Sequence, residues 1–293
     1  IRDNPMRLHM KKKTTVCRIC IALAIFAQMA FAGNRSGSVT GLFLKLPINA
    51  RATAMGNAQA ALAQGALSIP FNPAGTLSVA DFSLGATYNQ WWADITHSFV
   101  GVSANLSDLG TVGFGVLMLA TDDMLDRTPQ FPEGTGEKFK AFEAAYAVSY
   151  ARQISQEFGI GISAKYIQSN LFNKQLNAKS FALDIGTLYD IPVLQTRLGI
   201  SINNLGQDLT YISETYSIPS VLRFGALTTV VQNEENEMYL AFQIARPNDG
   251  DEQYNLGGEY VVMSTIALRG GYRFNYDEEN WSAGIGMNLR SLG

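Results

Sequence analysis

The sequence predicts an all-β protein: a transmembrane antiparallel β-barrel with a short helical plug at its N-terminus. Three observations favour this fold class. Apolar residues alternate with small or polar ones over many segments, an N-terminal stretch has the features of an export signal, and charge is sparse. Of the 293 residues, 47% are hydrophobic and only 16% are charged. This balance is unusual for a soluble enzyme, and the 16 Phe and 12 Tyr argue against disorder.

The first segment of the chain is expected to be a signal peptide. A positive group, Lys11–Lys13, is followed by an apolar stretch from Val16 to Phe31 that ends in the small-x-small pattern Ala30-Phe31-Ala32. A membrane-spanning helix would need about 20 uninterrupted apolar residues, and Gln28 interrupts this stretch. We therefore expect residues 1–32 to comprise upstream residues and a cleaved signal peptide, and the protein to be exported to the bacterial outer membrane.

The composition after residue 32 excludes several classes of function. Both cysteines, Cys17 and Cys20, lie before this point, so the remainder has no disulfide and no cysteine-ligated zinc. Its only histidine is His97, which leaves few catalytic or metal-binding schemes. The 16 basic and 24 acidic residues that remain give a net charge of −8, without any basic run. We expect no nucleic-acid partner, no cofactor and no bound metal.

Period-two alternation is the main evidence for a barrel. In residues 142–150, aromatic and aliphatic side chains take every second position, and the others are Glu143 and small residues. The same rhythm recurs in residues 158–166, 254–260, 266–274 and 281–289. A soluble sandwich would carry Lys, Glu and Thr on its polar face. Gly, Ala, Ser and Asn instead suit the lumen of a membrane barrel whose aliphatic face meets lipid.

Strand lengths and connections agree with this interpretation. We expect strands at residues 81–90, 97–106, 111–120, 141–152, 158–169, 179–189, 197–204, 219–231, 238–246, 254–263, 265–275 and 280–290. Short connections such as 107–110 alternate with long ones such as 121–140, as periplasmic turns and external loops do in outer-membrane barrels. The last residues read as a turn, so we expect a barrel of about 14 strands, of which about 12 lie in residues 81–293.

The segment before the first strand is expected to fill the barrel. Residues 46–63 are alanine-rich and lack period two, which predicts a short helix interrupted at Gly56. Residues 69–75 form a turn-rich cluster directly ahead of the first strand. Because an open barrel of this width would leak, we expect residues 33–80 to fold inside it as a plug.

Charged residues of both signs occupy lumen-facing positions of the predicted strands. They are Glu143, Lys165, Asp184, Glu259, Arg269 and Arg273. Such groups more often form structural ion pairs than a transport path. We expect Arg51 of the plug to pair with a lumenal acid such as Glu143 or Glu259 and to help seat the plug.

The plug segment carries a family resemblance. Its motifs are Ala50-Arg51-Ala52, Met55-Gly56-Asn57-Ala58, Ala61-Leu62-Ala63 and Asn72-Pro73-Ala74-Gly75. They resemble the PorV/PorQ family, outer-membrane barrels of Bacteroidetes and related bacteria that are similar in fold to the FadL fatty-acid transporters. Arg51, Met55, Gly56, Asn72, Pro73, Ala74 and Gly75 are the motif residues that we assign to the plug. The sequence departs from the family at Asn49, Gln64-Gly65 and Pro70-Phe71.

The resemblance implies a fourteen-stranded plugged barrel in the outer-membrane lipid. For PorV it implies a role in type IX secretion. There the barrel receives folded cargo from the translocon through the cargo's C-terminal signal domain and carries it to the attachment machinery.

The sequence leaves two functions open. A secretion component would bind cargo through external loops, of which residues 121–140 are the largest. A FadL-like channel for hydrophobic small molecules would need an apolar pocket and a movable plug, and the polar lumen weighs against it. We expect no enzyme, because His97 and Ser98 lie on opposite faces of one strand. We interpret His97 as an interfacial residue and the neighbouring pair Trp91-Trp92 as part of an aromatic girdle.

Overall fold

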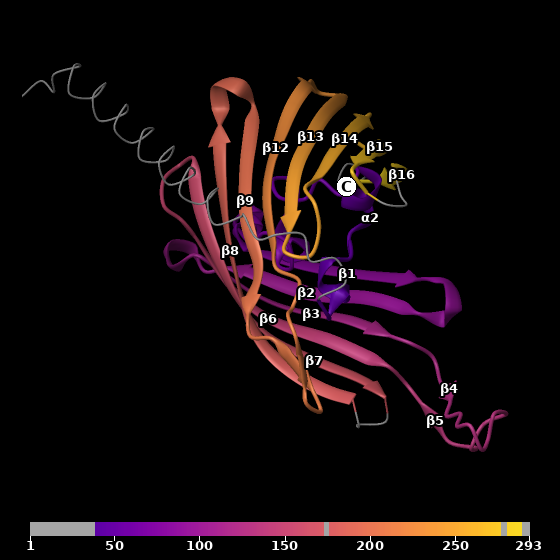
Figure 1. Ribbon diagram of the computed structural model, residues 1–293. Coiled ribbons are helices and arrows are strands. Elements are labelled where there is room, and N and C mark those ends of the chain that lie inside the picture. Colours follow the sequence, from indigo (N-terminus) through magenta and orange to yellow (C-terminus); the bar gives the residue numbers. More distant parts are fainter. Residues whose placement is uncertain (1–38, 173–175, 277–279, 289–293) are drawn as a thin grey trace, which may run out of the picture. The chain divides into compact units, whose positions relative to one another are not determined.

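The computed structural model describes residues 39–172, 176–276 and 280–288, and the predicted signal peptide lies outside them. Twelve strands form one antiparallel sheet in the order β1-β2-β3-β6-β7-β8-β9-β12-β13-β14-β15-β16 (Figure 1). Their bounds are β1 Phe82–Gln90, β2 Thr96–Asn105, β3 Thr111–Ala120, β6 Phe142–Gln153, β7 Phe158–Phe172, β8 Leu176–Ile191, β9 Thr196–Gly206, β12 Val221–Gln232, β13 Asn236–Pro247, β14 Gln253–Val262, β15 Ile266–Phe274 and β16 Trp281–Met287. Each strand expected from the sequence has a counterpart here.

Strands β1 and β16 are the edges of this sheet. Closure into a barrel and a total of about 14 strands therefore stay predictions. Among the described residues, no helix has the length and apolar character needed to cross a bilayer.

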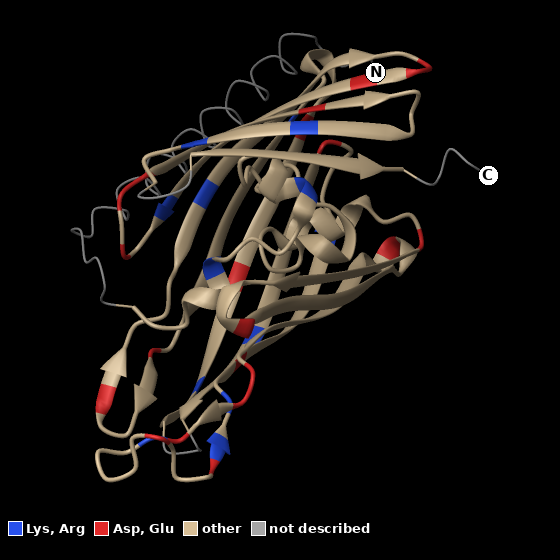
Figure 2. Ribbon diagram, turned by 90° about the vertical axis from the view of Figure 1, so that its right-hand side faces the viewer, with Lys and Arg blue, Asp and Glu red and all other residues tan. Residues whose placement is uncertain are grey.

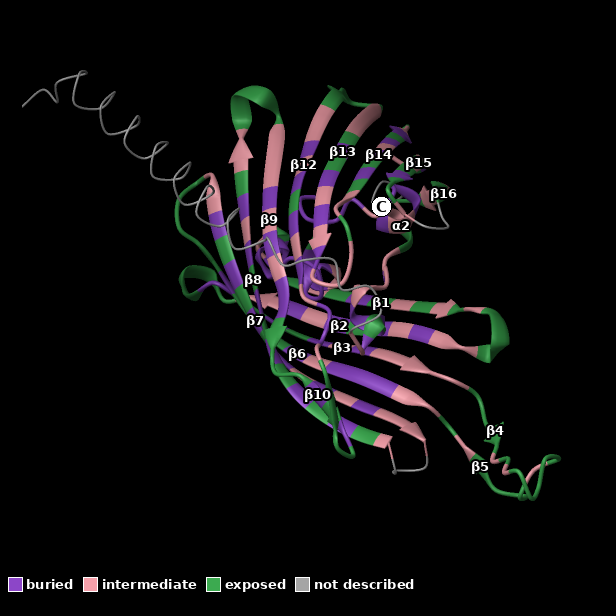
Figure 3. Cartoon of the chain, viewed as in Figure 1, coloured by how far each residue is buried: buried purple, intermediate pink, exposed green. Residues whose placement is uncertain are grey.

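The two faces of the sheet differ as expected for a membrane protein. On β6, Val148 and Tyr150 are 61% and 40% exposed, whereas Ser149 between them is 2% exposed. The same stripes of exposed and buried residues run along the neighbouring strands (Figure 3). The apolar face is thus the exposed one, and the face of small and polar residues is covered, the reverse of a soluble sandwich.

Residues 39–80 cover the inner face of the sheet in short helical turns. These are η1 (Leu42–Lys45), α2 (Ala50–Ala54), η2 (Gly65–Ser68) and η3 (Pro73–Ser78). The helix expected within residues 46–63 is only five residues long, because Gly56 adopts the left-handed conformation (φ 64°) directly after it. Asn49 begins α2 by accepting a hydrogen bond from the Arg51 main-chain N at 2.9 Å.

Two connections carry small sheets of their own. In the connection between β3 and β6, β4 (Met124–Leu125) pairs with β5 (Lys138–Phe139). Between β9 and β12, β10 (Leu209–Tyr211) pairs with β11 (Glu214–Tyr216), a hairpin that the alternation did not predict. Shorter connections contain the 3₁₀ turns η4 (Trp92–Asp94), η5 (Ser107–Leu109) and η6 (Pro192–Leu194).

The core lies between the plug and the inner face. One apolar cluster joins Phe43, Ile69 and Phe71 of the plug to Phe99 and Leu117 of the sheet. Leu209 and Tyr211 of the β10–β11 hairpin belong to this cluster too, so the hairpin packs inward over the start of the plug. A second cluster gathers small plug residues around Met55; it comprises Ala52, Met55, Ala58, Ala61, Leu62, Leu227 and Ala241.

Candidate functional site: the plug and the inner face of the sheet

The plug contacts strands along most of the sheet. Segments α2, η2 and η3 lie against β15–β16, β1–β2 and β6–β8 respectively. At its start, Thr40 N donates to Ser217 O at 3.0 Å, and the Lys45 ammonium lies 2.6 Å from an Asp249 carboxylate oxygen. A single short segment therefore bridges strands that are remote from one another in the sheet.

Arg51 forms the ion pair expected from the sequence, with Glu259 rather than Glu143. Its Nε lies 2.6 Å from Glu259 Oε2, and Arg269 approaches the other oxygen of the same carboxylate at 3.5 Å. The Glu259 side chain is only 5% exposed. Two cations around one nearly buried carboxylate offset the cost of taking that charge out of water.

The motif residues Met55 and Gly56 lie against β14–β16. Met55 is fully buried in the second apolar cluster. Gly56 N donates to Ser282 Oγ at 3.2 Å, and Gly56 O accepts from Asn255 Nδ2 at 2.6 Å. The strands thereby bind main-chain groups just after the short helix, where Gly56 N also donates to Thr53 O at 3.2 Å.

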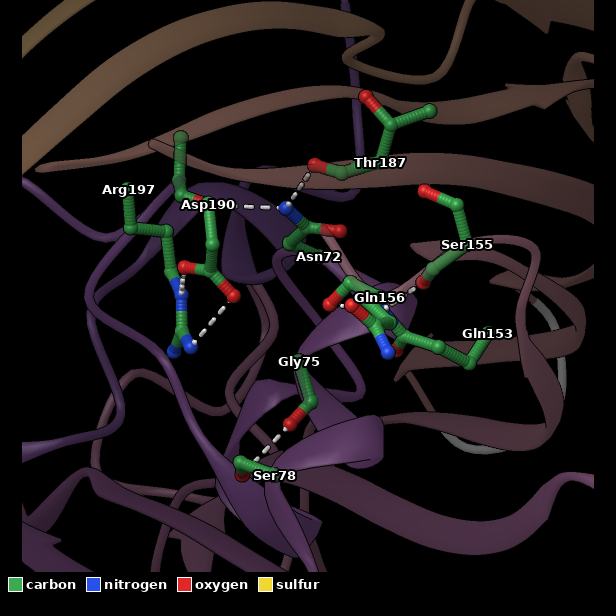
Figure 4. A network of polar contacts seen from close by, with 10 residues as sticks. Asn72, Gly75, Ser78, Gln153, Ser155, Gln156, Thr187, Asp190 and Arg197 are labelled. Atoms are coloured by element: carbon green, nitrogen blue, oxygen red, sulfur yellow. Dashed lines mark hydrogen bonds and ion pairs between the residues drawn. The ribbon is translucent and has the colours of Figure 1, made fainter. Parts of the chain in front are cut away.

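Asn72 is fully buried and joins three chain segments. Its Nδ2 donates to Thr187 O of β8 at 3.1 Å (Figure 4). The same Nδ2 donates to Ala60 O at 2.7 Å, and Oδ1 accepts from Ala74 N at 3.1 Å. The last bond caps η3. The side chain therefore fixes the turn and holds it against the sheet.

The next three motif residues continue the turn. Pro73 is the first residue of η3, and Ala74 is fully buried. A Cβ at Gly161 of β7 would overlap the main-chain N of Ala74, so only glycine lets η3 approach this strand. Gly75 O accepts from Ser78 Oγ at 2.9 Å within the turn.

Lys165 and Asp184 form a fully buried ion pair on β7 and β8. Their N–O separation is 2.6 Å, and the side chains are 3% and 0% exposed. Asn204 completes the group: its Oδ1 accepts from Lys165 Nζ at 2.8 Å and its main-chain N donates to Asp184 Oδ1 at 2.7 Å. Both charges are thus hydrogen-bonded as well as paired.

Glu143 has a different partner from the one considered in the sequence. Ser169 Oγ donates to Glu143 Oε1 at 2.9 Å, and Tyr211 Oη donates to Ser169 Oγ at 2.7 Å. This chain of hydrogen bonds ties the inward-packed β10–β11 hairpin to β6 and β7.

Two arginines complete the charged lining. Arg273 lies on the inner face, with its guanidinium 5.8 Å from the Tyr276 ring centroid. Arg223, which was not among the lumenal charges expected from the sequence, is 6% exposed and donates to Asn203 Oδ1 at 2.7 Å. Its inward position follows from the alternation Val221, Arg223, Gly225 on β12, so the period-two pattern could have revealed it.

The other residues singled out in the sequence are His97 and the pair Trp91-Trp92. His97 lies at the start of β2, the strand end expected from the sequence; it faces inward and is fully buried, with its ring 6.0 Å from that of Trp91. Trp92 is 80% exposed, in keeping with a girdle position. No group of His, Cys, Asp and Glu among the described residues could hold a metal ion.

A small cavity and an open cleft adjoin the plug. One has a volume of about 10 Å³, lies between Pro70 and strands β2–β7, and is lined by Phe99, Leu117 and Lys165 among others. It has room for one water molecule. The other is an open cleft of about 350 Å³ between the β8–β9 and β12–β13 connections, with Gln64 of the plug and Tyr239 in its lining.

The connection that carries β4 and β5 presents the largest exposed loop. Charged residues are sparse along the strands and frequent in such connections (Figure 2). Phe131 is 59% exposed in a turn where its N donates to Thr128 O at 3.0 Å. Lys140 and Asp123 form an exposed pair at 3.6 Å.

An antiparallel sheet with an exposed apolar face and an inner face of small and polar residues is typical of outer-membrane β-barrel proteins. Residues 31–247 match the family model of the type IX secretion system protein PorV. The chain belongs to the PorV family. No curated protein matches the chain.

Solved structures confirm the FadL-like fold. The Pseudomonas putida toluene transporter TodX is 13% identical over 88% of this chain and 89% of its own, with a TM-score of 0.53. The monoaromatic hydrocarbon channel CymD is 14% identical over 83% and 89%, with a TM-score of 0.52. The Ralstonia pickettii toluene transporter TbuX is 14% identical over 82% and 88%, with a TM-score of 0.51.

Proposed function

We propose that the protein is a non-enzymatic outer-membrane barrel of type IX secretion that binds or shuttles exported cargo proteins. The observation that carries this proposal is the match to the PorV family over residues 31–247. The partners on this view are the secretion machinery and cargo with C-terminal signal domains. The motif residues Arg51, Met55, Gly56, Asn72, Pro73, Ala74 and Gly75 would act by holding the plug in place.

The packing of the interior supports a binding role over open conduction. Plug side chains such as Phe43, Ile69 and Phe71 fill the space against the sheet, and the β10–β11 hairpin packs over them. Several lumenal charges are paired with one another or with the plug, as in Lys165–Asp184 and Arg51–Glu259. A protein that presents a surface needs no passage through its interior.

The connection between β3 and β6, which carries β4 and β5 and is called the β4–β5 connection below, is the surface that we propose for binding cargo. Its exposed apolar side chains include Met124, Leu125 and Phe131. Exposed apolar groups on a loop held by its own small sheet are suited to binding another protein.

Affinity purification of the full-length protein in mild detergent, with mass spectrometry of co-purifying proteins, tests this function. We expect exported proteins that share a C-terminal type IX signal domain. A Phe131→Ser variant should lose them, whereas Ile212→Ser, at an 80% exposed residue of the β10–β11 turn, should retain them. A wild-type preparation without such proteins would refute the proposal.

The fold favours a second candidate, a channel for hydrophobic small molecules. TodX and TbuX are described as toluene transporters and CymD as a monoaromatic hydrocarbon channel. The cavity of about 10 Å³ beside Pro70 is too small for such molecules, and the cleft of about 350 Å³ lies at the β8–β9 and β12–β13 connections, so passage between the strands would need the plug to move. Stoichiometric fatty acid or aromatic hydrocarbon in the purified protein, without cargo, would favour this candidate.

A further inference from the structure

The plug segment from Ala54 to Ala61 is bound to the strands through its main chain. Among the described residues, its hydrogen bonds to the sheet all use main-chain N–H and C=O groups of the segment, and the sheet supplies side chains. Ser282 Oγ, for example, donates to Ala54 O at 3.1 Å. The sheet therefore distinguishes the side chains of this segment only by their size.

Two buried amides of the sheet carry most of this contact. Gln243 of β13, which is 2% exposed, accepts at Oε1 from Gln59 N at 3.0 Å and from Ala60 N at 2.9 Å. Its Nε2 donates to Asn57 O at 3.1 Å. Asn255 of β14 is fully buried and donates to Gly56 O at 2.6 Å. An amide can donate and accept together, which suits it to main-chain recognition.

The shape of the inner face restricts what can lie there. A Cβ at Gly199, Gly257 or Gly271 would overlap main-chain atoms of the segment. The segment in turn presents small side chains, and Ala58 and Ala60 are 3% and 1% exposed. The strands and the segment thus approach at main-chain distance, which larger residues on either side would prevent.

We propose that the inner face of β9 and β12–β16 is a peptide-binding site for the main chain of an alanine-rich segment, filled here by Ala54–Ala61. The partners in these contacts are 183 to 228 positions apart in sequence, so the covalent chain does not force the segment onto these strands. The same segment on a separate peptide therefore occupies the site once the resident segment is displaced. This inference goes beyond the proposed function and does not depend on it.

Complementation in trans tests the site. In the full-length protein, Ala60→Leu displaces the resident segment, because the Ala60 Cβ lies only 3.1 Å from where a Cβ at Gly225 would stand. The probe is a fluorescent peptide with the sequence of residues 49–65. We expect saturable binding to the Ala60→Leu protein and a thermal midpoint restored towards wild type. The same peptide carrying Ala60→Leu should not bind.

A second substitution tests the amide contact. Adding Gln243→Leu to Ala60→Leu should weaken peptide binding at least about tenfold, because two N–H donors of the peptide lose their acceptor. The matched control is Gln168→Leu on β7, likewise added to Ala60→Leu. This second double variant should bind the peptide as tightly as Ala60→Leu alone. Failure of the unaltered peptide to bind, or equal binding to both double variants, would overturn the inference.

A disulfide provides an independent route if Ala60→Leu does not fold. In the double variant Ala60→Cys with Gly225→Cys, the two Cβ atoms start 3.1 Å apart, so the segment must move out by a few tenths of an ångström to form a disulfide, and the chain has no other cysteine after Cys20. The reduced protein should bind the peptide weakly, and the oxidised protein should not bind it. Binding that survives oxidation, or no binding after reduction, contradicts the inference. Neither result bears on cargo, so the secretion proposal is judged separately.

Discussion

The ion pair between Lys165 and Asp184 is the most completely buried charge contact between strands of the described sheet. Removing one partner leaves the other charge in a space that water does not reach. We expect Asp184→Asn to lower the free energy of unfolding by about 3–5 kcal/mol. Denaturant unfolding of the barrel in lipid vesicles measures this. Asp123→Asn, in the exposed pair with Lys140, should cost less than about 1 kcal/mol, and equal losses would contradict the argument.

A substitution at Arg51 tests whether this single residue holds the plug in place. Arg51→Ala removes a charge-assisted hydrogen bond to a carboxylate that is 5% exposed, and we expect a loss of about 1.5–3 kcal/mol and more frequent channel openings. Single-channel recordings and thermal unfolding give the two readouts. Arg51→Lys should fall between wild type and alanine. Unchanged conductance together with unchanged stability would show that the ion pair does not hold the plug.

At the scale of elements, the approach of the η3 main chain to β7 depends on Gly161. We expect Gly161→Val to push η3 off the strand and to cost about 1–3 kcal/mol or more, because its Cβ would overlap the main chain of Ala74. Gly270→Val on β15 is the control, since a Cβ there meets nothing within 4 Å. Limited proteolysis of the plug measures release. Equal protection of the two variants would argue against close packing as the cause.

The β10–β11 hairpin is a second element whose position depends on few contacts. Tyr211→Phe removes the hydroxyl that donates to Ser169. We expect about 1 kcal/mol of local stability to be lost and protease cleavage within the hairpin to become faster. Tyr216→Phe, at a 44% exposed residue of the same hairpin, should be cleaved at the wild-type rate. Slower or unchanged cleavage of Tyr211→Phe would show that apolar packing alone holds the hairpin.

At the scale of the whole molecule, the exposed apolar face predicts insertion into lipid. Val148→Arg places a charge on the outer face of β6, and we expect a cost of about 2–4 kcal/mol if the residue lies near the bilayer midplane. Folding yield into vesicles, read from heat-modifiable migration on a gel, measures it. Phe131→Arg in the β4–β5 connection should fold as wild type. A Val148→Arg protein that folds equally well would place this face outside the membrane.

Local patterns in the sequence determined the strands, their two faces and the separate character of the segment before β1. Period-two alternation needs only neighbouring residues, so it placed Glu143, Lys165 and Asp184 on the inner face without knowledge of the fold. The segment before β1 was likewise recognisable from its composition, which is rich in alanine and turn-forming residues. Its motifs indicated the PorV family, and the family match confirms this.

The tertiary structure decided which groups meet. Arg51 pairs with Glu259 and not Glu143 because the path of the plug brings α2 towards β14–β16, contacts that span about 200 residues of sequence. The inward β10–β11 hairpin, the buried His97 and the main-chain contacts of Gln243 arise in the same way. Such contacts depend on register and on how segments distant in sequence approach in space, and no local periodicity encodes either.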